Sequence, residues 1–240
     1  MPVAVNLFNH LGGLENEEIY ESLDGVDTTI DDSRAEALVE NELVEEVDPT
    51  EYELRITTEA VENNGVLVSA TVAYDTLKPR GHRPAENSWY KDVERFTVRF
   101  SDTLFDDGGF VILGGGRPGG KLLHLQDILA VSPDDYERVN LQTGTIEDIV
   151  KEDSQDSKTR TVADYDEYTE AATASGRVDE TGSLGSDLES SGDTTWEMFE
   201  STEYDGTVGV GTDSIVFYGN IWSPESMMDY IEEMIIPRID

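Results

Sequence analysis

Apolar residues recur at helical spacing in two segments near the start of the chain. Residues 15–23 (ENEEIYESL) form the first segment and residues 32–46 (DSRAEALVENELVEE) form the second. Each segment therefore predicts an amphipathic helix. Asp48-Pro49 ends the second helix, because the residue before a proline disfavours helical backbone.

Three alternating segments and one apolar run then predict two hairpins. EYELRIT at 51–57 and VLVSATVAY at 66–74 alternate, and the Asn63-Asn64-Gly65 sequence before the second is typical of a tight turn. ERFTVRF at 94–100 also alternates, and the apolar run FVIL at 110–113 follows an Asp-Asp-Gly-Gly turn. We expect the strands of each pair to be antiparallel.

A short helix is expected at 121–130, and short strands at 195–201, 206–212 and 214–220. Ser223 before Pro224 is a typical helix start. One apolar stripe follows on this last helix, formed by Met227, Tyr230, Ile231 and Met234. The stripe either docks on its own sheet or makes a subunit contact, for which methionine is well suited. We take it as a candidate subunit contact.

Residues 151–195 break this regularity, because they are rich in Asp, Ser, Thr, Gly and Glu with few large apolar residues. So long a tract without its own elements is unusual inside a compact domain. We expect an acidic arm or loop that bridges subunits.

The predicted fold class is α+β, with a mostly antiparallel sheet core, short helices near both termini and this long acidic insertion. Residues 1–150 hold the N-terminal helices and strands, 151–195 form the arm, and 196–240 pack on the first part. The length permits one domain or two closely packed lobes. The order strand, strand, helix at 94–130 recurs at 206–236 and hints at an internal repeat.

Charge restricts the possible functions. The 240 residues include 53 acids and 16 bases, for a net charge of −37, yet 37% are hydrophobic, which is enough for a folded core. Two explanations of the acidity remain, which are mimicry of nucleic acid and adaptation to molar salt. At about 1 M salt the Debye length is roughly 3 Å, so self-repulsion is screened. The even spread of carboxylates favours adaptation to salt, and therefore an origin in an extremely halophilic archaeon or one of its viruses. The expected location is a high-salt cytoplasm or a virion.

Half of the cations gather in residues 78–121, which hold 8 bases and 6 acids. Exposed aromatic residues lie among them, as in surfaces that bind anions or single-stranded nucleic acid. The alternative is that these cations pair with carboxylates of the same chain or of a neighbouring copy. The candidate anion-binding or subunit-contact residues are Lys78, Arg80, Arg83, Trp89, Tyr90, Lys91, Arg95, Arg99, Arg117 and Lys121.

Within this segment, FVILGGGRPGGKL at 110–122 resembles a phosphate-binding loop, because Gly115, Gly120 and Lys121 have the G-x-x-x-x-G-K spacing. Leu122 stands where such loops need Ser or Thr for Mg²⁺, and the preceding strand is expected in an antiparallel hairpin. We therefore do not expect nucleotide hydrolysis, although an anion remains a possible ligand.

Other chemistry is not indicated. The chain has no cysteine, its three histidines lack metal-site spacing, and no nucleophile elbow occurs. We predict no catalytic residues, no metal and no cofactor, and neither a signal peptide nor a membrane span.

The leading hypothesis is a non-enzymatic structural or interaction subunit of a larger assembly, for example a virion neck or tail component, that forms homo-oligomers or binds other acidic subunits. Heterologous contacts between its cationic segment and the acidic face of the next copy would build such an assembly. The alternatives are an anion or nucleic-acid binding module that uses residues 78–121, an enzyme of unknown class and a nucleic-acid mimic.

Overall fold

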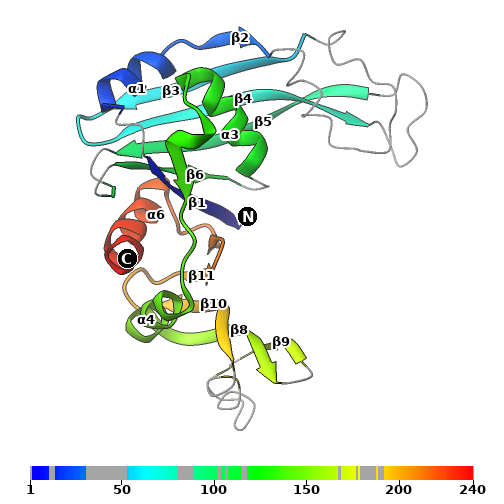
Figure 1. Ribbon diagram of the computed structural model, residues 1–240, viewed down its shortest axis with the longest axis vertical. Coiled ribbons are helices and arrows are strands. Elements are labelled where there is room, and N and C mark those ends of the chain that lie inside the picture. Colours follow the sequence, from blue (N-terminus) through cyan, green and yellow to red (C-terminus); the bar gives the residue numbers. More distant parts are fainter. Residues whose placement is uncertain are drawn as a thin grey trace. The chain divides into compact units, whose positions relative to one another are not determined.

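The computed structural model of the chain describes residues 2–10, 14–30, 53–79, 89–101, 104–105, 108–114, 118–166, 169–176, 178, 188 and 192–239 (Figure 1). The chain divides into two compact units. One comprises Met1–Phe8 with Arg138–Asp240, and the other comprises Asn9–Glu137. Both are built from antiparallel strands and a few short helices, so the expected α+β class with a mostly antiparallel sheet holds in outline.

The unit Asn9–Glu137 contains a five-stranded antiparallel meander in the order β2-β3-β4-β5-β6. Its elements are α1 (Asn16–Leu23), β2 (Asp27–Thr29), β3 (Arg55–Asn63), β4 (Val68–Pro79), β5 (Trp89–Ser101), β6 (Gly109–Leu113) and α3 (Pro118–Leu129). Both predicted hairpins are confirmed, because β3 pairs with β4 and β5 pairs with β6. The Asn64 side chain closes the first turn by accepting from the amides of Val66 and Leu67.

The alternation of the strands decides which face of this sheet is covered. Val72 and Phe96, paired across β4 and β5, are buried together with Val98. Ile19 of α1 is buried as well, and α1 contacts β3, β4, β5 and α3. His124 of α3 packs on Tyr74 with ring centroids 4.3 Å apart. The helices α1 and α3 therefore cover one face of the sheet (Figure 1).

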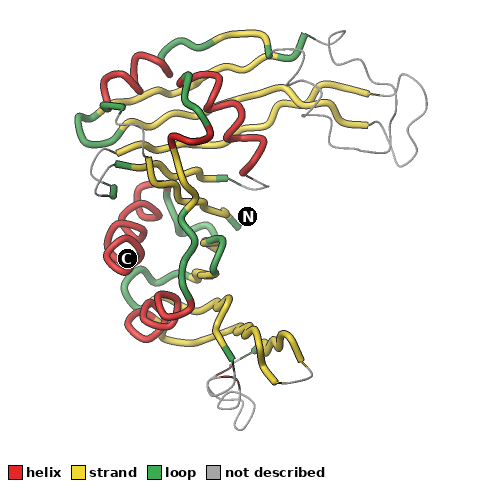
Figure 2. Tube along the Cα trace, in the orientation of Figure 1, coloured by secondary structure: helices red, strands yellow, loops and turns green. Residues whose placement is uncertain are grey.

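The other unit has strand order β1-β12-β11-β10-β8-β9. Its elements are β1 (Val3–His10), α4 (Thr143–Asp153), β8 (Ser154–Asp166), β9 (Thr169–Ser175), β10 (Asp193–Ser201), β11 (Thr207–Gly211), β12 (Ile215–Tyr218) and α6 (Pro224–Tyr230). The last residues of β1 and the short strand β7 (Tyr136–Arg138) lie where the chain passes between the units. Figure 2 shows the strands and helices along the trace.

The C-terminal helix begins as predicted. The Ser223 side chain accepts from the amide of Ser226, and Pro224 occupies the first helical position. The helix continues as a π-helical turn at Ile231–Ile235 and a 3₁₀ turn at Ile236–Arg238. Tyr230 packs edge-on against Phe217 of β12 and against Trp222, so this end of the chain docks on its own sheet.

The tract 151–195 differs from its prediction. Strands β8 and β9 occupy Ser154–Asp166 and Thr169–Ser175, and β8 pairs with both β9 and β10. The inward positions of β8 are filled by Ser157 and Arg160 as well as by Val162. Polar residues at buried positions hide the alternation that marks a strand. The helix predicted at 32–46 lies outside the described residues.

The described elements follow the same order twice along the chain. A strand, a helix, five strands and a helix run from β1 to α3, and the same series runs from β7 to α6. The repeat expected between 94–130 and 206–236 corresponds to β5-β6-α3 and β11-β12-α6. The order of elements therefore repeats over a longer stretch than the sequence indicates.

Candidate interaction surface

The face of the β2–β5 sheet opposite α1 and α3 is the open face of this unit among the described elements. Side chains alternate across a strand, so the neighbours of buried Ile56 point away from the helices. Arg55 and Glu59 of β3 lie on this face and are exposed, as is Arg95 of β5. The open face is therefore polar and charged.

Its charged side chains pair across neighbouring strands. Arg55 Nη2 lies 2.6 Å from Asp27 Oδ1, Lys91 Nζ lies 3.3 Å from Asp75 Oδ2, and Arg95 Nε lies 3.3 Å from Glu59 Oε2. We call this group of six residues the charge-paired face. It holds three cations and three carboxylates, so it is neutral in a chain whose net charge is −37.

The charge-paired face is hollowed into a shallow groove of about 320 Å³. Thr57, Ala73 and Val93 line the groove together with most of the paired charges. Val93 is apolar yet 47% exposed, at a point where β5 is paired with β4 and the pairing with β6 has not yet begun. Small and apolar side chains thus lie between the charged ones.

Two other candidate residues on β4 and β5 do not belong to this face. Lys78 Nζ lies 2.7 Å from Asp92 Oδ2 and 2.9 Å from Glu94 Oε1. Hydrogen bonds to both carboxylates raise the pKa of Lys78, and the bond from Lys78 lowers the pKa of Asp92. Tyr90, which pairs with Lys78 across the strands, is 38% exposed.

Lys121 does not have the exposure of a phosphate ligand. It is 3% exposed, and its Nζ donates to the Gly114 carbonyl at 3.0 Å. Burial lowers the pKa of this ammonium group. The lysine therefore ties the start of α3 to the end of β6, and residues 115–117 of the glycine-rich loop lie outside the described part.

Arg99, another candidate contact residue, is also buried, at 9% exposure. It pairs with Ser69 of β4 and Val111 of β6, so β5 has a paired strand on each side of Arg99, whereas Arg95 pairs with β4. Arg80, Arg83, Arg117 and the side chain of Trp89 lie outside the described residues.

The apolar stripe of the C-terminal helix is buried within its own unit. The exposures of Met227, Tyr230, Ile231 and Met234 are 5%, 0%, 0% and 6%. A subunit contact made by these side chains would require unpacking the helix. Docking on the chain's own sheet is the arrangement that the structure has.

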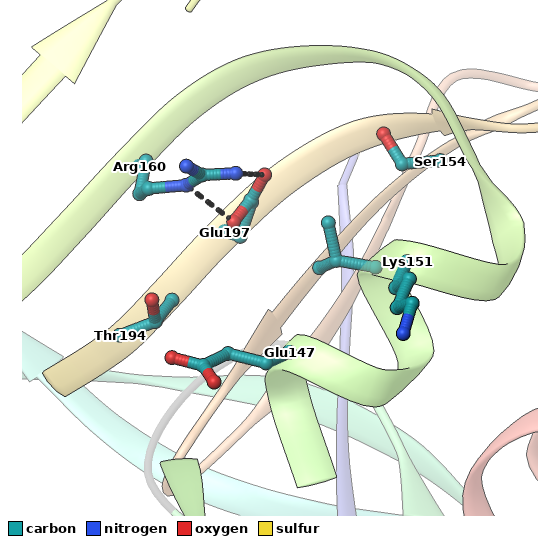
Figure 3. Close-up of a pocket in the computed structure, with 7 residues that line it drawn as sticks. Glu147, Lys151, Ser154, Arg160, Thr194 and Glu197 are labelled. Atoms are coloured by element: carbon teal, nitrogen blue, oxygen red, sulfur yellow. Dashed lines mark hydrogen bonds and ion pairs between the residues drawn. The ribbon is translucent and has the colours of Figure 1, made fainter. Parts of the chain in front are cut away.

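A polar cavity of about 430 Å³ lies in the other unit, between α4 and the strands β8 and β10 (Figure 3). A buried ion pair forms part of its lining: Arg160 Nε and Nη2 donate to the two carboxylate oxygens of Glu197 at 2.8 and 3.0 Å. Ser157 Oγ also donates to Glu197, at 2.5 Å. Glu147 and Lys151 of α4 lie at the edge of the cavity, and the Glu147 carboxylate points toward Thr194.

Two carboxylates and two cations line this cavity, so its lining carries no net charge. Its buried ion pair is fully hydrogen-bonded at Glu197 and explains how a polar strand joins the sheet. In the described residues, no three His, Asp or Glu side chains come together in an arrangement that could hold a metal ion. None of the described helices is long and apolar enough to cross a membrane.

Comparison with protein-family models and with curated protein sequences finds no match to this chain. The surface must therefore be interpreted from its own geometry. The sequence patterns indicated Lys91 and Arg95 but not their partners Asp75 and Glu59, nor the pair of Arg55 with Asp27. The pairing follows from strand register, which one sequence with 53 acids does not specify.

Proposed function

We propose that the chain is a non-enzymatic interaction subunit that assembles with further copies of itself in a high-salt environment, inside a halophilic cell or in a virion. One observation carries this proposal. In a molecule with net charge −37, an open sheet face carries equal numbers of cations and carboxylates and an exposed Val93.

Electrostatic repulsion limits where two copies can meet. Two copies with 53 acids each repel one another wherever acidic surfaces meet, and salt screens this repulsion only beyond about 3 Å at 1 M. A locally neutral face avoids like-charge contact at close range, and its exposed apolar residue gains free energy when it is buried. Such a face is where two copies can approach at least cost.

Binding of an anion or a nucleic acid has less support. Lys78, Lys91 and Arg95 are bound to carboxylates of the same chain, and Lys121 is buried against its own backbone. An anionic ligand brings only negative charge to cations that already have carboxylate partners, whereas a second copy of the charge-paired face brings cations as well. Molar salt weakens each phosphate contact further.

The test is absolute molar mass by light scattering after size exclusion, in KCl on the order of 2–3 M, where screening is strong. We expect a discrete multiple of the 26.6 kDa chain mass. A mass of 26.6 kDa at every protein concentration would contradict the proposal.

A further inference from the structure

We propose that a second copy of this chain docks face to face on the charge-paired face, related to the first by a two-fold axis that runs parallel to the strands between β3 and β4. This inference rests on the proposed function and specifies the partner and the contacts.

The register of the sheet arranges charges in a row that is suited to a two-fold contact. Asp27, Thr57, Ala73 and Arg95 lie opposite one another in one row across the four strands β2 to β5. The carboxylate is at one end of the row, the guanidinium is at the other, and the two small residues are in the middle. At about 4.8 Å per strand, the ends are about 14 Å apart.

A two-fold axis along the middle of this row exchanges its ends. It places Asp27 of each copy opposite Arg95 of the other, and Thr57 opposite Ala73. Because the operation is reciprocal, the Asp27–Arg95 contact forms twice, once from each copy. Small side chains at the centre let the two sheets approach to about 10 Å, the usual distance between packed sheets.

The neighbouring row supports the same axis. Thr29 pairs with Arg55, the Asp75 carboxylate accepts from the Arg55 amide at 3.1 Å, and Asp75 pairs with Val93. Rotation about the same axis places Arg55 opposite Asp75 of the second copy. Val93 then meets Thr29, so its exposed surface is covered. Both rows are thus self-complementary in charge, as an isologous contact requires.

A charge-swap experiment tests this arrangement. The first variant carries Arg95→Asp with Asp75→Arg, and the second carries Asp27→Arg with Arg55→Asp. Each pair of substitutions leaves the net charge at −37 but places like charges opposite one another in a homotypic contact. In the mixed contact every cation faces a carboxylate again.

The expected result is a lower molar mass than wild type for each variant alone in molar KCl, and recovery of the wild-type mass in an equimolar mixture. The matched control is Lys158→Glu with Glu200→Lys, which exchanges an exposed cross-strand pair in the other unit and should keep the wild-type mass. Circular dichroism melts confirm that each variant is folded. If a double variant does not fold, Arg95→Asp and Asp27→Arg alone form the same complementary pair.

Two results would overturn the docking proposal while leaving the proposed function intact. One is a wild-type mass in both variants alone. The other is a mixture that stays at the reduced mass although the wild type assembles. A wild type that is monomeric under all conditions would overturn the proposed function itself.

Discussion

At the scale of single residues, the two kinds of ion pair in this molecule differ in burial. Arg160 and Glu197 are 9% and 2% exposed, whereas Lys158 and Glu200 are 36% and 43% exposed. Removing one partner of a buried pair leaves an uncompensated charge, while an exposed pair contributes little.

Arg160→Met is therefore expected to lower the free energy of unfolding by about 3 kcal/mol or more, and Lys158→Met by less than about 1 kcal/mol. Urea denaturation in molar KCl measures both values. Similar losses in the two variants would refute the distinction.

Lys78 gives stability that depends on pH. Its hydrogen bond lowers the pKa of Asp92. Burial acts to raise the pKa of Glu94, but hydrogen bonds from Lys78 and Tyr74 outweigh it, and this pKa is lowered too. Stability from a lowered carboxyl pKa is present above the unfolded pKa and is lost as pH falls through the folded pKa.

We expect Lys78→Met to melt below wild type at about pH 7, and the difference to shrink as pH falls from about 4.5 to about 3. Lys151→Met is the control, because the structure shows no ion pair of Lys151 with a described residue. A Lys78→Met difference that stays constant over this range would argue against the assigned cause.

At the scale of elements, aromatic packing fixes the turn between β10 and β11. A Cβ atom built on Gly206 would lie 2.6 Å from two ring atoms of Trp222. That ring is held by Tyr204, Phe217 and Tyr230, with centroid distances of 5.7, 4.6 and 5.7 Å. The ring cannot move away without disturbing the cluster.

Gly206→Ala should therefore cost about 1–3 kcal/mol and change the near-ultraviolet circular dichroism of the aromatic cluster. Gly144→Ala on α4 is the matched control, because nothing lies within 4 Å of its added methyl group. Gly144 lies in the first turn of α4, so the control should gain at most about 0.5 kcal/mol from helix propensity. Equal effects at the two positions would show that the packing argument is wrong.

Sequence patterns predicted some of these strands and helices and missed others. Apolar alternation located β5, an unbroken apolar run located β6, and the serine–proline start located α6, because in these elements local chemistry and burial agree. Strand β8 was missed because its buried Ser157 and Arg160 are satisfied by Glu197, which is 40 and 37 residues away. Arg99 and Lys121 were predicted as contact residues because they are charged, but both side chains are buried.

At the scale of the whole molecule, acidity and salt are coupled. Self-repulsion among 53 acids opposes folding in dilute buffer, and molar salt screens it. The melting temperature of the wild type is therefore expected to rise with KCl from about 0.1 M to the molar range, as measured by scanning calorimetry. A melting temperature independent of salt would contradict the proposed high-salt habitat.

We infer that copies of this chain meet at the charge-paired face. Carboxylate labelling followed by mass spectrometry tests it directly, in molar KCl at protein concentrations below and above assembly. We predict that labelling of Asp27 and Asp75 falls on assembly, while the exposed Glu21 of α1 and Glu170 of β9 react unchanged. Equal labelling of Asp27 and Asp75 at both concentrations, with reduced labelling of other carboxylates on assembly, would contradict docking on the charge-paired face.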